Sequence, residues 1–354
     1  MPRLKTRIIL EAYKIDRLLP LLVRECRALD SARNELRWLR EQAQKISTKH
    51  ASIGWRRILK SMCRSRSRGV PLQYILGDQP FGELDIKCTK GVLIPRHETE
   101  TITFHTANLI LDSGPNALRF EERPLRILDL CTGTGCISLL LHALLSPHFS
   151  HLSIVGVDIS DTAIKLAKEN AKRNVRLGTL SERALTEVSF QRSNVLEFDP
   201  DRISSLKNLF GYTPNLPTSC GSQCDILISN PPYISLKQYH DGTTSRSVRT
   251  FEPKLALVPP EHTRVSTVGS SQVRHEDTFY CHIARLVSTF QAKLTILECG
   301  SRSQGLRVAA LCKYIIGRRG TLSGQVLIDV WSATDSHTGP TAVIIHNNGL
   351  CNET

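Results

Sequence analysis

The stretch "LDLCTGTGCIS", residues 128–138, decides the fold of this 354-residue chain. "LDL" ends an apolar run typical of a buried strand, and "CISLLLHALL" continues as an apolar helix. The turn between them carries Gly133 and Gly135, and glycines let the backbone approach a ligand closely. The helix that follows offers unpaired N–H groups at its N-terminus. A strand, a Gly-rich turn and a helix in this order predict the first unit of a ligand-binding α/β sheet.

Strand-like and helix-like segments alternate from this unit onward. Further strands are predicted at "LSIVGVD", "VSFQRS", "CDILIS", "LTILEC", "QVLIDV" and "TAVIIH", with a helix at "DTAIKLAKENAKRN". This alternation predicts a mostly parallel sheet with helices on both faces. Two stretches, 200–223 and 259–276, are rich in Ser, Thr, Pro and Gly, and we expect long surface loops there.

The segment N-terminal to the sheet differs in composition and in its pattern of apolar residues. Residues 1–70 hold 18 Lys and Arg against six Asp and Glu, and so carry most of the net charge of +13. Leu36, Leu39 and Ala43 recur at helical spacing, which predicts an amphipathic helix. A basic segment of this kind usually binds RNA, an acidic partner or an import machinery. The alternative is that it is only the solvated face of helices. Residues 71–95 read as a β-hairpin between two domains.

Composition excludes other classes. No run of 18 apolar residues is present, so we expect no membrane span. The eleven Cys are odd in number and scattered, without paired zinc-ligand spacing. We therefore expect reduced thiols and no metal site.

Asp158 ends the strand "IVGVD", 23 residues after Gly135. A carboxylate at this place can accept hydrogen bonds from both ribose hydroxyls of an adenosine-containing cofactor. A dinucleotide fingerprint would have a third Gly where Ser138 stands, which counts against NAD.

The stretch "SNPPY", residues 229–233, ends another buried strand. It is either a simple turn or a rigid holder for a planar guest, since two prolines stiffen the backbone. An amide nitrogen is a poor nucleophile because its lone pair is delocalised. If the Asn230 side-chain carbonyl and the Pro231 carbonyl each accept an N–H while Tyr233 stacks on the guest, the nitrogen is fixed for attack. This is the logic of S-adenosylmethionine-dependent methylation of an sp² nitrogen.

These motifs resemble class I methyltransferases that act on amide or exocyclic nitrogens. Four further stretches are similar to the HemK/PrmC family, the release factor glutamine methyltransferases: "PLQYILG" (71–77), "GVLIPRHETE" (91–100), "RTFEPKLAL" (249–257) and "LECGSRSQG" (297–305). The resemblance implies a Rossmann-like, seven-stranded, mostly parallel sheet. It divides the chain into a basic helical domain that binds the release factor (1–70), a hairpin linker (71–95) and a catalytic domain (96–354).

The resemblance also implies an activity and a site. The cofactor is S-adenosyl-L-methionine, and the substrate is the Gln of a Gly-Gly-Gln motif in a class 1 peptide chain release factor. The cofactor residues are Asp129, Thr132, Gly133, Thr134, Gly135, Asp158, Asn194, Val195 and Asn230. The acceptor residues are Asn230, Pro231, Pro232 and Tyr233. Arg96, Glu98, Thr99 and Glu100 form a linker motif beside the site, unless Arg96 and Glu98 simply form an interdomain ion pair.

Four positions depart from the family pattern, and one of them is Val195, where an aromatic residue is common. Cys131 replaces a frequent Gly, and because Cys disfavours positive φ we expect ordinary β geometry there. Asn194 stands where an Asp near the adenine is usual, and His97 replaces a common Pro.

Two other functions remain open at this stage. An adenine-N6 methyltransferase for RNA or DNA would interleave aromatic and basic residues for base stacking. The rings of the basic segment, Tyr13, Trp38 and Trp55, lie in helical contexts, so we expect no direct nucleic-acid binding. A catalytically inactive scaffold is the second alternative, against which the intact "NPPY" and Asp158 count.

We expect a monomer that makes no membrane contact. The family resemblance favours mitochondria over the cytoplasm, and basic residues near the N-terminus partly fit a transit peptide. Glu11 and Asp16 are unfavourable for such a peptide.

Overall fold

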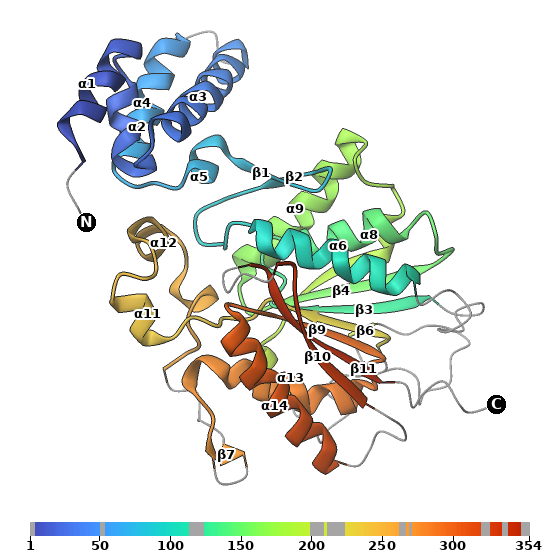
Figure 1. Cartoon of the computed structure of the whole chain (residues 1–354). Coiled ribbons are helices and arrows are strands. Elements are labelled where there is room, and N and C mark those ends of the chain that lie inside the picture. Colours follow the sequence, from blue (N-terminus) through green and yellow to red (C-terminus); the bar gives the residue numbers. More distant parts are fainter. Residues whose placement is uncertain are drawn as a thin grey trace.

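The computed structural model describes residues 4–49, 54–112, 124–198, 209–210, 224–261, 267–268, 271–319, 326–334 and 339–347. Five helices precede the first strand (Figure 1): α1 (Thr6–Ile15), α2 (Leu19–Cys26), α3 (Leu29–Lys49), α4 (Trp55–Ser67) and α5 (Leu72–Leu76). The amphipathic helix expected from the leucine spacing is confirmed. Leu36, Leu39 and Ala43 of α3 are buried in a core that these helices share. Arg66 of α4 also pairs with Glu35 of α3, at 2.8 Å and 2.9 Å.

A short hairpin connects this helical unit to the rest, but the prediction for residues 71–95 is wrong in part, because residues 72–76 form the helix α5 and only residues 78–87 pair as a hairpin. Strands β1 (Asp78–Phe81) and β2 (Leu84–Lys87) pair with each other in antiparallel fashion. The outer edge of β2 lies on α9 (Asp161–Leu177), where two buried Asn side chains take the place of a third strand. Asn174 Oδ1 accepts the Asp85 N–H and Asn170 Oδ1 accepts the Lys87 N–H, both at 2.8 Å. An open strand edge is thereby satisfied by side-chain amides.

Seven strands form the central sheet in the order β10-β11-β9-β6-β3-β4-β5. They are β3 (Leu125–Leu130), β4 (Leu152–Asp158), β5 (Val188–Arg192), β6 (Ile226–Ser229), β9 (Leu294–Cys299), β10 (Val326–Ser332) and β11 (Thr341–Asn347). The four pairings between β5 and β9 are parallel, whereas β11 joins β9, and β10 joins β11, in antiparallel fashion. The strand order reverses between β3 and β6, which is where ligands bind in open α/β sheets.

Each face of the sheet has its own core, because successive residues of a strand point to opposite faces. On one face, Ile127 and Ile226 pack under the hairpin, α6 (His97–Asp112), α8 (Cys136–Leu145) and α9. On the other face, Leu128 and Leu227 pack against α13 (Thr278–Phe290) and α14 (Arg302–Arg319). Figure 1 shows the two helical layers on either side of the sheet, which confirms the predicted α/β class.

Short elements complete the described chain. They are α10 (Ala184–Glu187), η1 (Val195–Glu197), α11 (Leu236–His240), α12 (Arg246–Phe251), η4 (Lys254–Ala256), β7 (Thr267–Val268), β8 (Ser271–Gln272) and η5 (His275–Asp277). The expectation of an irregular loop at 259–276 is wrong in part, since β7 and β8 pair there and η5 follows. Of the stretch 200–223, only 209–210 belong to the described residues.

No helix in the described ranges is long and apolar enough to span a membrane. The same residues hold no group of three or more His, Cys, Asp or Glu side chains arranged to bind a metal ion.

Gly156 of β4 gives a test of how tightly the sheet is packed beside the Gly-rich turn. An added Cβ would lie 2.6 Å from the Phe190 ring and 2.7 Å from Thr132 Oγ1. We expect Gly156→Ala to lower the free energy of unfolding by about 1–3 kcal/mol, because overpacking forces neighbours off their rotamers. Gly317→Ala in α14 is the matched control. Its Cβ meets nothing within 4 Å, so we expect a gain of about 0.5–1 kcal/mol. Urea unfolding measures both, and equal stability of Gly156→Ala and wild type would contradict the packing.

Candidate active site

The Gly-rich turn between β3 and α8 is held from below by a buried carboxylate. Asp129 Oδ2 accepts hydrogen bonds from Thr132 Oγ1 at 2.6 Å and Ser138 Oγ at 2.7 Å. Burial raises the pKa of Asp129 to about 6, against the lowering effect of these two donors. Asp129 is fully buried and does not line the cavity above the turn. It therefore shapes the turn from inside.

The expectation of β geometry at Cys131 is wrong. Its φ is +63°, in the left-handed region that non-Gly residues rarely adopt. With this turn, the Thr132 N–H reaches the carbonyl of Val157 in β4 at 2.9 Å, and the Thr132 hydroxyl reaches Asp129. A strained residue of this kind persists because several neighbouring bonds determine its conformation.

Asp158 lies at the end of β4, facing the turn. Its Oδ2 accepts the Gly133 N–H and its Oδ1 accepts the Ser160 N–H, both at 2.9 Å. Burial raises the pKa of Asp158, while these backbone donors lower it. Above it lies a cavity of about 220 Å³. The cavity is lined by residues of the turn, of the loop after β5 and of the segment before α6: Thr132, Gly133, Thr134, Asp158, Asn194, Val195, Leu93 and Arg96.

An adenosine-containing cofactor fits this cavity. Nothing lies within 4 Å of where a Cβ of Gly133 would stand, so the turn leaves open space above its backbone. Asp158 offers carboxylate oxygens to hydroxyl donors, and Val195 supplies an apolar wall. Asn194 is engaged locally: its Oδ1 accepts the Leu196 N–H at 3.1 Å, and its Nδ2 donates to Glu197 at 3.0 Å. Its side chain therefore caps η1.

The four residues of the acceptor motif lie at the end of β6, beside this cavity. Asn230 lines the cofactor cavity and also a wider groove of about 910 Å³. Its Nδ2 donates to Thr99 Oγ1 at 3.0 Å. Pro231 and Pro232 are buried, and Pro232 lines the cofactor cavity. The bond to Thr99 fixes the orientation of the Asn230 amide, so that its acceptor and its donor have different surroundings.

Tyr233 is held on three sides by the chain around the end of β9. Its hydroxyl donates to Glu298 Oε1 at 3.3 Å. Its ring lies against Gly300, where a Cβ would come within 2.8 Å. Its carbonyl accepts an N–H from Gln304 at 3.2 Å. The tyrosine is therefore a rigid wall of the groove.

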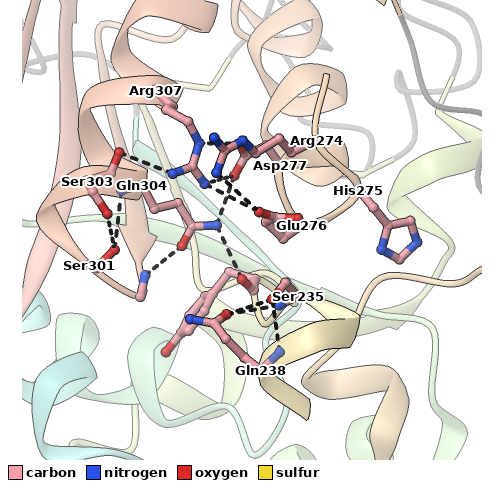
Figure 2. Close-up of polar contacts among 12 residues, drawn as sticks. Ser235, Gln238, Arg274, His275, Glu276, Asp277, Ser301, Ser303, Gln304 and Arg307 are labelled. Carbon is pink, nitrogen blue, oxygen red and sulfur yellow. Dashed lines mark hydrogen bonds and ion pairs between the residues drawn. The ribbon is translucent and has the colours of Figure 1, made fainter. Parts of the chain in front are cut away.

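Gln304 belongs to a polar network along the groove, which Figure 2 shows between the start of α14 and η5. Its Nε2 also donates to Asp277 Oδ1 at 3.0 Å, and its Oε1 accepts the Gly300 N–H at 3.0 Å. Arg307 donates two hydrogen bonds to the same Asp277 carboxylate, of 2.9 Å and 3.2 Å. Ser235 and Gln238 cap α11 on the opposite wall (Figure 2). The groove is thus built from several segments that are separate in the sequence.

The residues of the linker motif, 96–100, contact different parts of the structure. Arg96 pairs with buried Glu252 of the segment after α12 at 2.7 Å, so the alternative in which Arg96 and Glu98 form an ion pair is not the one that the structure adopts. Glu252 also accepts the Ile94 N–H at 3.1 Å. Glu98 lines the groove, whereas Glu100 turns away and accepts the Gly82 N–H of the hairpin at 2.9 Å.

Sequence reasoning did not single out Glu252, Glu298, Gln304 or Asn170. The first three lie inside stretches that the resemblance covers, and Glu298 alone gave a local signal, as a charged side chain within the apolar run "LTILEC". Asn170 looked like one more residue along a helix face.

The fold and the two cavities define a class I S-adenosylmethionine-dependent methyltransferase. In agreement, residues 121–204 match a family described as "Methyltransferase domain". The chain is 35% identical over 280 residues to the mitochondrial MRF1 N(5)-glutamine methyltransferase MTQ1 of Saccharomyces cerevisiae, covering 79% of this chain and 76% of that protein. It is 38% identical over 228 residues to a probable counterpart in Schizosaccharomyces pombe, covering 64% of each. It is also 34% identical over 221 residues to the release factor glutamine methyltransferase of Pasteurella multocida, covering 61% of each.

The chain therefore belongs to the family of release factor glutamine methyltransferases. Its cofactor is S-adenosyl-L-methionine.

Asp158 is the residue on which we expect cofactor affinity to depend most. Asp158→Ala removes a charged acceptor and also frees the Gly133 N–H. We expect the dissociation constant for S-adenosylmethionine to rise by an amount equal to roughly 2–4 kcal/mol. Calorimetry measures it, with Asp161→Ala as the control, because Asp161 is an exposed carboxylate three residues away. Wild-type affinity in Asp158→Ala would place the ribose elsewhere.

Proposed function

We propose that this chain transfers a methyl group from S-adenosylmethionine to the side-chain amide nitrogen of the Gln in a Gly-Gly-Gln motif of a class 1 release factor. Family membership supports the reaction. The single observation that carries the proposal is the place of Asn230. It lies where the cofactor cavity meets the wide groove, with its Nδ2 already bonded to Thr99.

The chemistry follows from that orientation. The cofactor supplies an electrophilic methyl group on sulfur. With its Nδ2 held by Thr99, Asn230 keeps Oδ1 to accept one N–H of the substrate amide, and the Pro231 carbonyl accepts the other. These two acceptors favour the nitrogen's rehybridisation, and stabilise the positive charge that grows on it as the new N–C bond forms. The bond between the methyl group and the donor sulfur would break with its electron pair left on sulfur, and the nitrogen would release one proton to water to restore the neutral amide.

We assign the remaining roles accordingly. The turn Thr132, Gly133, Thr134 and Gly135, with Asp129 beneath it, and Asp158, Asn194 and Val195 form the cofactor site. Asn230, Pro231, Pro232 and Tyr233 form the acceptor site. Arg96, Glu98, Thr99 and Glu100 border it, with Thr99 as the direct link to Asn230.

Adenine-N6 methylation is not favoured by the relatives. Of the described residues that line the groove, Tyr233 is the only Phe, Tyr or Trp, and its ring packs on Gly300. A flipped base needs rings to stack on. The deciding experiment supplies tritium-labelled S-adenosylmethionine with the folded release factor and with total RNA. Label on Gln supports the proposal, and label on adenine overturns it.

Asn230 gives the sharpest test of mechanism. Because its bond to the substrate strengthens as charge develops, we expect Asn230→Ala to lower kcat about 10²–10³-fold. Cofactor affinity should change much less. Asn230→Asp retains an acceptor but loses the Nδ2 donor to Thr99, so we expect an intermediate kcat. Single-turnover methylation of the folded factor measures both. Near wild-type kcat in a folded Asn230→Ala variant would show that "SNPPY" only terminates a strand and does not bind the substrate amide.

We further propose that the helical unit of residues 1–70 binds the release factor, with residues 71–95 as linker and 96–354 as the catalytic domain, in a monomer that acts in mitochondria. Two relatives named as mitochondrial support the location. Arg57, Lys60 and Arg64 are exposed along one face of α4 and offer a cationic surface to an acidic partner.

Charge reversal on α4 tests this surface. We expect Arg57→Glu, Lys60→Glu and Arg64→Glu together to raise KM for the release factor about tenfold at low salt, and less at high salt. The matched control reverses Lys165, Lys168 and Lys172, which are exposed on α9 with the same spacing. Equal KM in both triple variants would show that the α4 surface does not bind the factor.

A further inference from the structure

Glu298 is a buried carboxylate beside the acceptor motif with no part in the chemistry described so far. It lies in β9, in a run of six buried residues, and only 3% of its surface is exposed. Its Oε1 accepts the Tyr233 hydroxyl at 3.3 Å, and its Oε2 has no hydrogen-bond partner in the described part of the chain. An incompletely paired buried carboxylate lowers stability, so such a group is retained where its charge is used.

Thr99 connects this carboxylate to Asn230. The Thr99 side chain is itself 3% exposed, and its Oγ1 accepts the Asn230 Nδ2 hydrogen at 3.0 Å. As the hydroxyl oxygen is an acceptor there, its own hydrogen is left for another group. The Glu298 carboxyl lies close enough to Thr99 that this hydroxyl lowers the pKa of that carboxyl. Asn230, Thr99 and Glu298 thus form a chain of donors that ends on a carboxylate.

We propose that Glu298 is a positioning residue of the acceptor site, orienting and polarising the Asn230 amide through Thr99 and fixing the Tyr233 ring through its hydroxyl. This inference rests on the proposed methylation of an amide. A negative charge at the end of the chain draws the Thr99 hydrogen toward it, which makes Thr99 a better acceptor for Asn230 Nδ2. The Asn230 Oδ1 then carries more negative charge. It binds an N–H that is becoming cationic more strongly.

The ionisation of Glu298 should therefore be visible in the rate. Burial raises its pKa to about 7, with Glu98 acting in the same direction, while Arg96, Thr99 and Tyr233 lower it. Tyr280, Cys299 and Cys136 also lie close enough to interact electrostatically with Glu298; burial raises their pKa values, so they stay neutral near pH 7.

The stability effect has the opposite sign. A carboxyl whose folded pKa lies above its ordinary value favours the folded state in its neutral form, so stability falls as pH rises from about 4.5 through 7. A neutral Gln in place of Glu298 should therefore be relatively more stabilising at pH 8 than at pH 5. Lower activity with equal or higher stability separates a positioning role from a structural one.

The experiment compares Glu298→Gln with wild type on the folded release factor between pH 6 and pH 8. We expect wild-type kcat to rise about tenfold with an apparent pKa near 7, following the ionised fraction. In Glu298→Gln we expect a flat profile, about tenfold below wild type at pH 8, with cofactor affinity unchanged within twofold. Glu187→Gln is the matched control. Glu187 is a largely buried carboxylate bound by His142 and Arg183, away from both cavities, and this variant should keep the wild-type profile.

Two further variants cover the case in which Glu298→Gln fails to fold. Thr99→Val breaks the chain with little change of shape, and should flatten the pH profile, whereas Thr99→Ser keeps the hydroxyl and should retain the slope. The same pH dependence in wild type, Glu298→Gln and Thr99→Val would overturn the inference. Mass spectrometry of the wild-type product tests the proposed function separately, because a methyl group absent from Gln refutes that function whatever the pH profile.

Discussion

The position of the whole site depends on one buried amide, that of Asn170. Its Oδ1 accepts the Lys87 N–H of the hairpin, and its Nδ2 donates to the Thr134 carbonyl of the Gly-rich turn at 3.0 Å. A single side chain on α9 therefore sets the distance between the cofactor turn and the linker hairpin. The segment that follows the hairpin carries Thr99, which in turn orients Asn230. Turn, linker and acceptor motif are thus placed by a continuous series of side-chain hydrogen bonds, and the sheet supplies the support.

Three buried carboxylates surround this series, and each fixes backbone or a polar group at the cost of some stability. Asp129 holds the turn, Glu252 holds the linker through Ile94 and Arg96, and Glu298 faces Thr99 and Tyr233. Burial raises the pKa of Asp129 to about 6 and that of Glu298 to about 7. Such groups are expected where orientation matters more than stability. The site is therefore rigid because polar groups, rather than apolar packing alone, determine its geometry.

Most of the architecture follows from local patterns in the sequence. Alternating apolar strands and amphipathic helices predict the parallel sheet, and a carboxylate or amide at a strand end predicts which edge binds the ligand. What local patterns cannot supply is the partner of a side chain. Arg96 finds Glu252 rather than Glu98, across more than 150 residues. Cys131 adopts a positive φ because the next residue, Thr132, then forms hydrogen bonds with Val157 and Asp129 that stabilise the turn. Both outcomes depend on tertiary contacts, whose energy exceeds a local preference.

The question raised by the two prolines of the acceptor motif has a physical answer in the groove. Stiffening Pro231 and Pro232 would achieve little if the residue after them were free to move. Tyr233 is not free: Gln304 holds its carbonyl, Gly300 leaves room for its ring and Glu298 takes its hydroxyl. Asn230 at the other end is held by Thr99. A short stiff segment fixed at both ends keeps its middle carbonyls in place without reorganisation, which is what pre-organised acceptors require. The cavity for the methyl donor and the groove for the acceptor can then meet beside Asn230, one of the residues that line both, because the bond to Thr99 already orients its side chain.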